Sequence, residues 1–284
     1  MRVLILGGTG MLGHQLVKAF GDVNIESYAT IRSPVSAMTG NAESKITYFS
    51  GVEAFDFGSL SRAILLSRAD VVINCIGVRA SKSNSETELF AINADLPRRI
   101  SEICKETNAK FIHISTDGVF SGDHGPYRDH DLPDAPDPYG QSKANGEITA
   151  PHVLNLRLSF IGPERGQATG LFAWALGQRK NTISGYVNVF TTALTSPVIA
   201  RWLVRLVQKN LFVPGTKHLA GPPISKFELL QKLNTAFDLG IEIEPAIEPR
   251  SDRRLICSEF QDESLSKLPS WDEMIEELRM NYDA

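Results

Sequence analysis

Short runs of apolar residues alternate with longer amphipathic stretches over residues 1–160. Each run is apolar at consecutive positions, which is typical of strands in a parallel sheet covered on both faces. The expected strands are Val3–Leu6, Glu26–Ile31, Val71–Ile76, Phe111–Ile114 and Val153–Leu156, and the expected helices are Met11–Phe20, Ser59–Ser67, Glu86–Thr107 and Pro138–Thr149. This alternation predicts a doubly wound α/β fold with a parallel sheet of the Rossmann type.

The pattern is less regular in the second half of the chain. Ser121–Pro138 is rich in Asp, Pro, His and Gly and predicts a long loop. Further helices are expected at Leu171–Arg179, Ser196–Gln208, Ser225–Phe237 and Trp271–Met280, with short strands near Val187–Phe190, Lys217–Leu219 and Ile241–Ile243. We expect a Rossmann domain over residues 1–160, which the chain rejoins at about residues 185–210, and a smaller α+β region over residues 161–284 that closes over the carboxyl edge of the sheet.

Composition narrows the class of protein. The chain has 284 residues, of which 42% are hydrophobic, and a formal net charge of −4. Such a mildly acidic chain has no overall attraction to nucleic acid or to an anionic membrane, so we expect neither as a partner. Cys75, Cys104 and Cys257 lie far apart and the six histidines are not grouped, so neither a disulfide framework nor a metal is expected. With no stretch long enough to span a bilayer, the expected location is the cytoplasm.

A glycine-rich turn joins the first predicted strand to the first helix. Gly7, Gly10 and Gly13 are spaced three residues apart at this point. Such a turn lets the backbone approach a pyrophosphate, whose charge meets the amides and the positive dipole end of the helix. The same glycines would also suit a tight turn without a ligand, but their place between strand and helix favours a dinucleotide site.

The end of the second predicted strand bears on the choice of dinucleotide. It carries Arg32 and no carboxylate. A carboxylate at this place would bind the two ribose hydroxyls of NAD, whereas an arginine accommodates the 2′-phosphate of NADP. We therefore expect NADP(H) in preference to NAD(H), with a solvated surface arginine as the alternative.

A Tyr–Lys pair lies on a second predicted helix. Asp137 and Pro138 suit the N-cap and the first helical position, which places Tyr139 and Lys143 on one face. An ammonium near a phenol lowers the phenol pKa, and such a tyrosine can protonate the oxygen of a ketone that accepts hydride. Alone, this spacing also fits a surface pair. Thr116 follows the strand Phe111–Ile114, and because ligands bind beyond the carboxyl ends of strands, we expect its hydroxyl to meet the pair.

These residues resemble the extended short-chain dehydrogenase/reductase family, and within it the dTDP-4-dehydrorhamnose reductases. The resemblance covers nearly the whole chain. It is carried by GGTGMLG (7–13), Asn74–Gly77, Asn93, STDGVFSG (115–122), YGQSKANGE (139–147) and Leu156–Phe160, and more loosely by Gly185–Thr195, His218–Gly221 and Ser251–Arg254. The chain departs from the family pattern at Gly118, where these reductases usually carry a bulkier residue, often tyrosine.

The motifs and the resemblance together give expected roles for individual residues, with Arg32, Arg253 and Arg254 expected from the chemistry of arginine and phosphate. The catalytic set is Thr116, Tyr139 and Lys143. The expected cofactor-binding residues are Gly7, Thr9, Gly10, Met11, Leu12, Gly13, Arg32, Asp56, Phe57, Cys75, Ile76, Gly77, Tyr139, Lys143, Leu158 and Ser159. Substrate binding is expected from Thr116, Asp117, Tyr139, Arg253 and Arg254, with the two arginines either on a diphosphate, which suits their donor geometry, or merely solvated.

The expected function is NADPH-dependent reduction of the C4 keto group of a nucleotide-linked 4-keto-6-deoxy sugar, in the synthesis of polysaccharide precursors. Residues 161–284 would form most of the substrate-binding region, and a homodimer is a further expectation. An epimerase or dehydratase of the same fold is an alternative, although dehydratases commonly carry Asp-Glu where this chain has Asp117 and Gly118. The other alternative is a non-catalytic, NADP-binding regulatory subunit.

Overall fold

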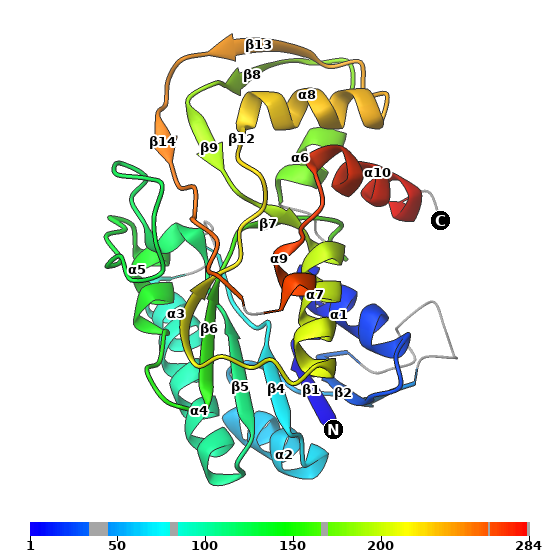
Figure 1. Ribbon diagram of the computed structural model, residues 1–284, viewed down its shortest axis with the longest axis vertical. Helices are drawn as coiled ribbons and strands as arrows, with labels where there is room; N and C mark the ends of the chain where they lie inside the picture. Colours follow the sequence, from blue (N-terminus) through cyan, green and yellow to red (C-terminus); the bar gives the residue numbers. More distant parts are fainter. Residues whose placement is uncertain (34–44, 80–84, 166–169, 261, 283–284) are drawn as a thin grey trace.

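The computed structural model describes residues 1–33, 45–79, 85–165, 170–260 and 262–282. Figure 1 shows a large sheet flanked by helices, with a smaller group of strands and helices above the carboxyl ends of its strands. The two parts meet along this edge. Any site built at the edge therefore draws residues from both halves of the sequence.

The large sheet has seven strands in the order β11-β6-β5-β4-β1-β2-β3, and all neighbouring pairs are parallel. Its strands are β1 (Arg2–Leu6), β2 (Glu26–Thr30), β3 (Ile46–Phe49), β4 (Val71–Asn74), β5 (Lys110–Ile114), β6 (Val153–Arg157) and β11 (Gly215–His218). The predicted doubly wound Rossmann-type fold is thereby confirmed. The strand order reverses between β1 and β4, and such a switch point opens a crevice for ligands.

Helices cover both faces of this sheet. Alternate residues of β1 enter two separate cores, which explains its unbroken apolar run. On one face lie α1 (Met11–Gly21) and α7 (Ser196–Gln208), and on the other lie α2 (Phe57–Ser67), α3 (Glu86–Phe90), α4 (Leu96–Glu106) and α5 (Pro138–Asn145). Asp137 accepts a hydrogen bond from the Gly140 amide at 2.9 Å, so the predicted start of α5 is confirmed.

The predicted uninterrupted helix Glu86–Thr107 is wrong in one respect. A π-helical turn, η2 (Ala91–Asp95), separates α3 from α4. Asn93 lies in this turn and bonds the backbone of Val78, with Nδ2 2.8 Å from the carbonyl oxygen and Oδ1 3.0 Å from the amide nitrogen. The widened turn thus directs a buried amide toward the loop after β4, and π turns are often found at functional sites.

The smaller region consists of short strands and three main helices. The helices are α6 (Leu171–Leu176), α8 (Lys226–Ala236) and α10 (Trp271–Tyr282), with a short α9 (Glu263–Ser266). The strands are β7 (Phe160–Ile161), β8 (Thr182–Tyr186), β9 (Val189–Thr191), β10 (Leu194–Thr195), β12 (Ile224–Ser225), β13 (Glu242–Ala246) and β14 (Ser251–Asp252). They pair in three small sheets. β14 is parallel to β9, which brings the segment after Asp252 to the carboxyl edge of the large sheet.

Two edge strands differ from the sequence-based expectation. The strand predicted near Lys217–Leu219 was assigned to the smaller region, but β11 instead extends the large sheet beside β6. β3 was not predicted at all, although it pairs with β2 at the opposite edge. Each strand lies at an edge of the sheet and pairs on one side only. Edge strands are often short and partly polar, as these two are, so their apolar pattern is weak.

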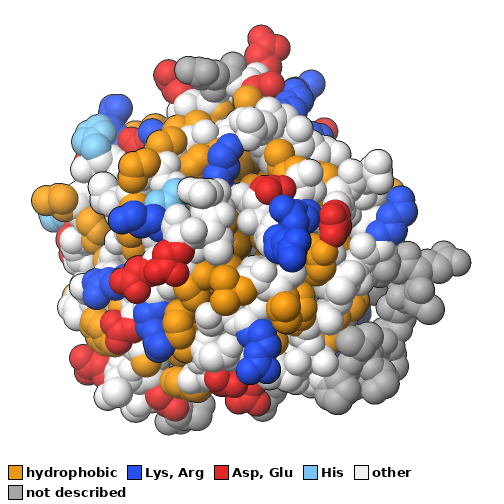
Figure 2. All heavy atoms as spheres, turned by 90° about the horizontal axis from the view of Figure 1, so that it is seen from below, with side chains coloured by type: hydrophobic (Ala, Val, Ile, Leu, Met, Phe, Trp, Pro, Cys, Tyr) orange, Lys and Arg blue, Asp and Glu red, His pale blue; other side chains and the backbone are white. Residues whose placement is uncertain are grey.

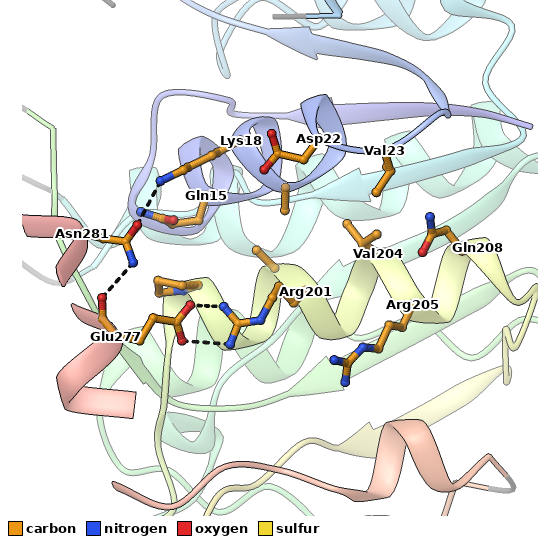
Figure 3. Close-up of a pocket in the computed structure, with 13 residues that line it drawn as sticks. Gln15, Lys18, Asp22, Val23, Arg201, Val204, Arg205, Gln208, Glu277 and Asn281 are labelled. Carbon is orange, nitrogen blue, oxygen red and sulfur yellow. Dashed lines mark hydrogen bonds and ion pairs between the residues drawn. The ribbon is translucent and has the colours of Figure 1, made fainter. Parts of the chain in front are cut away.

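Polar contacts join the helices and the long loop around the large sheet to the C-terminal part of the chain. Lys18 of α1 bonds Asn281 of α10 at 3.1 Å, and Arg201 of α7 pairs with Glu277 of α10 beside a surface groove (Figure 3).

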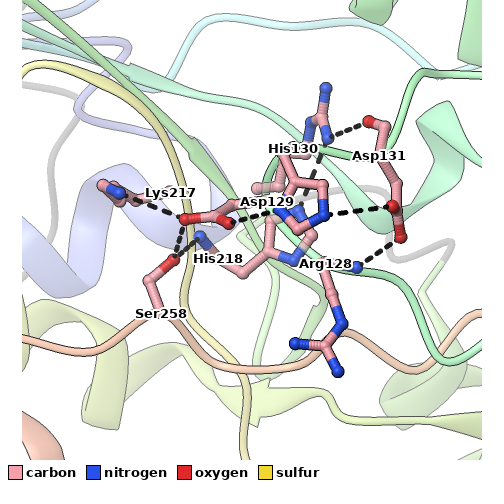
Figure 4. Close-up of polar contacts among 8 residues, drawn as sticks. Arg128, Asp129, His130, Asp131, Lys217, His218 and Ser258 are labelled. Atoms are coloured by element: carbon pink, nitrogen blue, oxygen red, sulfur yellow. Dashed lines mark hydrogen bonds and ion pairs between the residues drawn. The ribbon is translucent and has the colours of Figure 1, made fainter.

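The long loop over residues 121–137 is attached to β11 and the C-terminal segment. Figure 4 shows Asp129 of this loop between Lys217 Nζ at 3.1 Å and Ser258 Oγ at 3.0 Å.

Figure 2 shows one face of the molecule, on which basic and acidic side chains are interspersed with hydrophobic ones. Among the described residues, no helix combines the length and apolar character needed to cross a membrane.

A buried ion pair links β6 to the end of α5. Arg157 donates to both carboxylate oxygens of Glu147 at 2.9 and 2.8 Å, and the two side chains are only 4% and 9% exposed. Ser115, directly after β5, donates to the same carboxylate at 2.7 Å. The three contacts fix the carboxyl ends of two strands and the helix between them in one arrangement.

Glu147→Gln should therefore destabilise the protein by about 3–5 kcal/mol, because it leaves the guanidinium of Arg157 buried without its counter-charge. The free energy of unfolding from urea denaturation measures this loss. Glu277→Gln is the matched control, since it removes the carboxylate of the exposed pair with Arg201 and should cost less than about 1 kcal/mol. Equal losses in the two variants would show that the buried pair is not a special constraint.

Candidate active site

The glycine turn after β1 lies at the switch point of the sheet. A Cβ on Gly13 would lie 2.0 Å from the carbonyl oxygen of Gly7, so only glycine lets α1 start this close to the strand. The amide of Gly7 donates to Thr30 Oγ1 at 3.0 Å, which fixes the turn against the end of β2. Gly10 is the N-cap of α1, and no described side chain caps it, so the first amides of the helix face the cleft.

A cavity of about 610 Å³ lies beside this turn. Gly7, Thr9, Gly10 and Met11 line one side of it, and Arg32 lines the end nearest β2. Cys75, Ile76 and Gly77, after β4, line the opposite side. The cavity is bordered by backbone amides and by the side chains of Arg32 and Arg165, an arrangement that suits a dinucleotide.

Asp56 and Phe57 lie outside this lining. Asp56 is the N-cap of α2 and accepts a hydrogen bond from the Ser59 amide at 3.2 Å. The ring of Phe57 packs under the guanidinium of Arg99 at 3.6 Å. The residues that line the cavity from this loop are the preceding ones, Val52–Phe55.

A second cavity, of about 460 Å³, continues from the first and contains the proposed catalytic set. The two share Gly10, Met11 and the segment Cys75–Val78. The second cavity is also lined by Leu12, Thr116, Asp117, Tyr139, Lys143, Leu158, Ser159 and Arg253. Segments from distant regions of the sequence therefore converge on one cleft at the carboxyl edge of the sheet.

Tyr139 and Thr116 lie close to each other in the lining of this cavity, on either side of Gly118. Close packing of α5 places the phenol there: a Cβ on Gly140 would lie 2.2 Å from the carbonyl oxygen of Gly118 and 2.3 Å from the Cβ of Ala135. A Cβ on Gly118 would itself lie 3.2 Å from the Tyr139 ring. The departure from the family pattern at Gly118 thus lets the Tyr139 ring pack closely against the backbone.

Lys143 is buried next to the pair, but its charge acts differently from our expectation. Its Nζ donates to the carbonyl oxygen of Ile114 at 2.7 Å, and burial lowers the pKa of the ammonium to about 8. Burial also raises the pKa of Tyr139 above its usual value. The pKa of the phenol is therefore shifted opposite to the expected direction, because the loss of solvent around it is the largest effect and exceeds the opposing contact with Thr116. A protonated Tyr139 is the form that donates a proton.

Asp117 and Arg253 face each other across the substrate end of the cavity. Burial raises the pKa of Asp117 to about 6, against the opposing effects of the Arg253 charge and a hydrogen bond with Ser159. Arg254 does not line the cavity: it binds Asp252 through Nε at 2.8 Å and lies over the ring of Phe190. The structure thus separates the two arginines that were predicted together.

Several lining residues were missed from the sequence. Asn93, Arg79 and Glu164 border the cleft, and Thr30 holds the glycine turn. Arg79 and Glu164 form an ion pair of 2.8 Å. Asn93 belongs to a motif that carried the resemblance, but the π turn that directs it inward leaves no signal in a pattern of apolar positions. Among the described residues, no His, Cys, Asp or Glu cluster is arranged to hold a metal ion.

Curated proteins with similar sequences include reductases and a subunit of a methionine adenosyltransferase. The chain is 30% identical over 237 residues to the probable low-salt glycan biosynthesis reductase Agl14 of Haloferax volcanii, covering 78% of this chain and 74% of the relative. It is 34% identical to a probable dTDP-4,6-dihydroxy-2-methyloxan-3-one 4-ketoreductase of Streptomyces antibioticus, covering 59% of this chain and 54% of the relative. It is 29% identical to methionine adenosyltransferase 2 subunit beta of Bos taurus, covering 51% and 41% respectively. The alignments with the last two relatives cover only about half of each relative's own length, or less.

The fold also occurs in solved structures. The crystal structure of a dTDP-4-dehydrorhamnose reductase from Bacillus anthracis in complex with NADP has a TM-score of 0.77, 20% sequence identity and 99% coverage of both chains. The model of the RmlD substrate binding domain family matches residues 1–283. The chain therefore belongs to the RmlD substrate-binding domain family, within the extended short-chain dehydrogenases/reductases.

Proposed function

We propose that this protein reduces the C4 keto group of a nucleotide-linked 4-keto-6-deoxy sugar, using a nicotinamide dinucleotide. The observation that carries the proposal is the convergence of Thr116, Tyr139 and Lys143 in one cavity that continues to the glycine turn. The named activities of the Haloferax and Streptomyces relatives support the same reaction class.

The cofactor would lie along the two connected cavities. Gly7, Thr9 and Gly10 with the first amides of α1 would bind its diphosphate, and Cys75–Gly77 would border its nicotinamide half. When bound, it supplies the hydride that reduces the keto carbon. NADP(H) is the preferred form, because Arg32 borders the cavity at the end of β2 and no carboxylate takes its place.

The side chains of the second cavity would act on the sugar. Tyr139 protonates the developing alkoxide, which its raised pKa favours because the phenol is kept in its protonated form. Thr116 orients the carbonyl through its hydroxyl. Lys143, held by the carbonyl of Ile114, would bind the nicotinamide ribose. Arg253 faces the cavity and would bind the substrate diphosphate, whereas Arg254 is occupied by Asp252.

A non-catalytic regulatory subunit is the second candidate, which the similarity to methionine adenosyltransferase 2 subunit beta favours. NADPH oxidation in the presence of keto-sugar nucleotides separates the two functions, because a regulatory subunit would not consume the cofactor. Stoichiometric consumption also excludes an epimerase or a dehydratase, since both regenerate the cofactor in each cycle. A cytoplasmic location and a homodimer stay predictions.

Tyr139→Phe should lower kcat by about 10²–10⁴-fold, because the ring keeps its packing but loses the proton that it donates. NADPH affinity, measured by fluorescence titration, should change little. Tyr28→Phe is the matched control, since the Tyr28 hydroxyl bonds Glu26 on β2, away from the cleft. Turnover of the Tyr139 variant within about tenfold of the wild type would contradict the assignment.

Arg32→Ser should raise the KM for NADPH by about tenfold or more and leave the KM for NADH nearly unchanged, because only NADPH carries the 2′-phosphate. Steady-state kinetics with both cofactors measure the ratio. Arg62→Ser, on the exposed face of α2, is the control for a change of surface charge. An equal change in both KM values would show that Arg32 does not read the phosphate.

A further inference from the structure

We propose that Arg165 binds the diphosphate of the nicotinamide cofactor together with the glycine turn, and that Glu164 positions it for this contact. The inference rests on the proposed function, because it takes the two connected cavities as the cofactor site. Arg165 belongs to none of the motifs that predicted this site. It would be a second phosphate-binding arginine besides Arg32, contributed by the segment that follows β7.

The residues that line both cavities mark the middle of the cofactor site. Met11 and the segment Cys75–Val78 line both cavities, and so does Glu164. From this point the first cavity extends to Arg32 at the end of β2, and the second extends to Tyr139. A dinucleotide that runs through both cavities therefore has its diphosphate, which joins its two halves, beside the shared residues.

Arg165 lies next to this middle region. It directly follows Glu164 and lines the first cavity, which the glycine turn also lines. Its charge acts on the first turn of α1 as well: burial lowers the pKa of His14 there, and the guanidinium of Arg165 adds to the lowering. A guanidinium binds two phosphate oxygens with parallel hydrogen bonds, and helix amides bind the same group. The diphosphate would thus be held by the start of α1 and by one arginine.

The contacts of Glu164 fix the segment that carries Arg165. One carboxylate oxygen accepts a hydrogen bond from the amide of Gly170, the N-cap of α6, at 2.7 Å. The other oxygen forms the ion pair with Arg79 at 2.8 Å, and the Glu164 side chain is only 11% exposed. A Cβ on Gly170 would lie 3.0 Å from Cε of Met11, so the start of α6 packs against the glycine turn. One carboxylate therefore joins the loop after β4 to the start of α6, across the cofactor site.

The pairing with Arg79 also explains how a carboxylate can border an anion site. Glu164 lines both cavities, and an uncompensated negative charge there would repel a diphosphate. The guanidinium of Arg79 supplies the counter-charge, so the pair holds the segment in place without adding net charge. The attraction for the diphosphate then comes from Arg165. We regard Glu164 as a positioning residue, because it acts through Arg165.

Two fragments of the cofactor separate the roles of the two arginines. ADP-ribose carries the diphosphate without a 2′-phosphate, and adenosine 2′-monophosphate carries the 2′-phosphate without a diphosphate. Arg165→Ser should raise the Kd for ADP-ribose by about tenfold and leave the Kd for adenosine 2′-monophosphate within about twofold, because it removes a charge-assisted contact with the diphosphate alone. Arg32→Ser should show the reverse pattern. Isothermal titration calorimetry measures the four constants.

Arg250→Ser is the matched control for Arg165→Ser. Arg250 is exposed, pairs with Glu248 at 3.2 Å and lines neither cavity, so its loss should leave the Kd for both fragments within about twofold. An unchanged Kd for ADP-ribose in Arg165→Ser would overturn the inference. A loss of affinity that is equal for both fragments, or confined to adenosine 2′-monophosphate, would overturn it too, because the guanidinium would then not be specific for the diphosphate.

The positioning role of Glu164 has a readout of its own. Glu164→Gln removes the charge that holds Arg79, and the Kd for ADP-ribose should rise by about threefold or more because Arg165 is no longer held in place. In the Arg165→Ser background the same change should have little effect, since nothing is left to position. Glu248→Gln is the control. Tighter binding of ADP-ribose by Glu164→Gln, or an equal rise in both backgrounds, would show that the carboxylate does not act through Arg165.

Failure of the inference differs from failure of the proposed function. If the wild type oxidises NADPH with a keto-sugar nucleotide and Arg165→Ser binds ADP-ribose as tightly as the wild type does, only the role of Arg165 is excluded. If the wild type binds ADP-ribose in the expected manner but consumes no NADPH with any substrate of this class, the proposed reduction fails and the role of Arg165 stands. If the wild type binds neither NADPH nor ADP-ribose, both fail.

Discussion

The bidentate contact between Arg157 and Glu147 positions the rest of the cleft. Glu147 also accepts a hydrogen bond from Ser115, so one carboxylate joins the ends of β5 and β6 to the C-terminal side of α5. Thr116 directly follows Ser115, and Lys143 lies one turn before Glu147. A pair this deeply buried is costly to desolvate, but it permits little freedom in the geometry that it fixes. Reacting groups must be held within fractions of an ångström, so a rigid link of this kind serves the chemistry more than the stability.

Burial has a second consequence, which is electrostatic. It raises the pKa of Tyr139 and of Asp117 and lowers the pKa of Lys143. All three groups are thereby shifted toward their uncharged forms, which suits a site that must deliver a proton to a neutral carbonyl. The sequence suggested that an ammonium beside the phenol would dominate. The structure assigns the dominant effect to exclusion of solvent, with Asp117 and not Lys143 as a charged neighbour that acts on the phenol.

Much of the fold could be predicted from the sequence because the central strands are apolar on both faces. β1, β4 and β5 are mainly apolar along their length, whereas the edge strands β3 and β11 pair on one side only and give a weak pattern. The glycine turn and the Thr116–Tyr139–Lys143 set have fixed spacings, and the structure brings them to one cleft. Asp56 and Arg254 do not line it, because a shift of one or two residues in a loop decides whether a side chain faces the cleft or is held elsewhere. Asn93 depends on a π turn, which helical periodicity does not show.

The central claim is that a hydride passes directly from a nicotinamide to the keto carbon of a sugar held beside Tyr139. NADPH carrying deuterium at the transferred position of its nicotinamide tests this most directly, with the product analysed by NMR after reaction with a nucleotide-linked 4-keto-6-deoxy sugar. The account predicts one deuterium at C4 of the sugar for each NADPH oxidised. Oxidation of the cofactor without label at C4, or no oxidation with any such sugar, would contradict it.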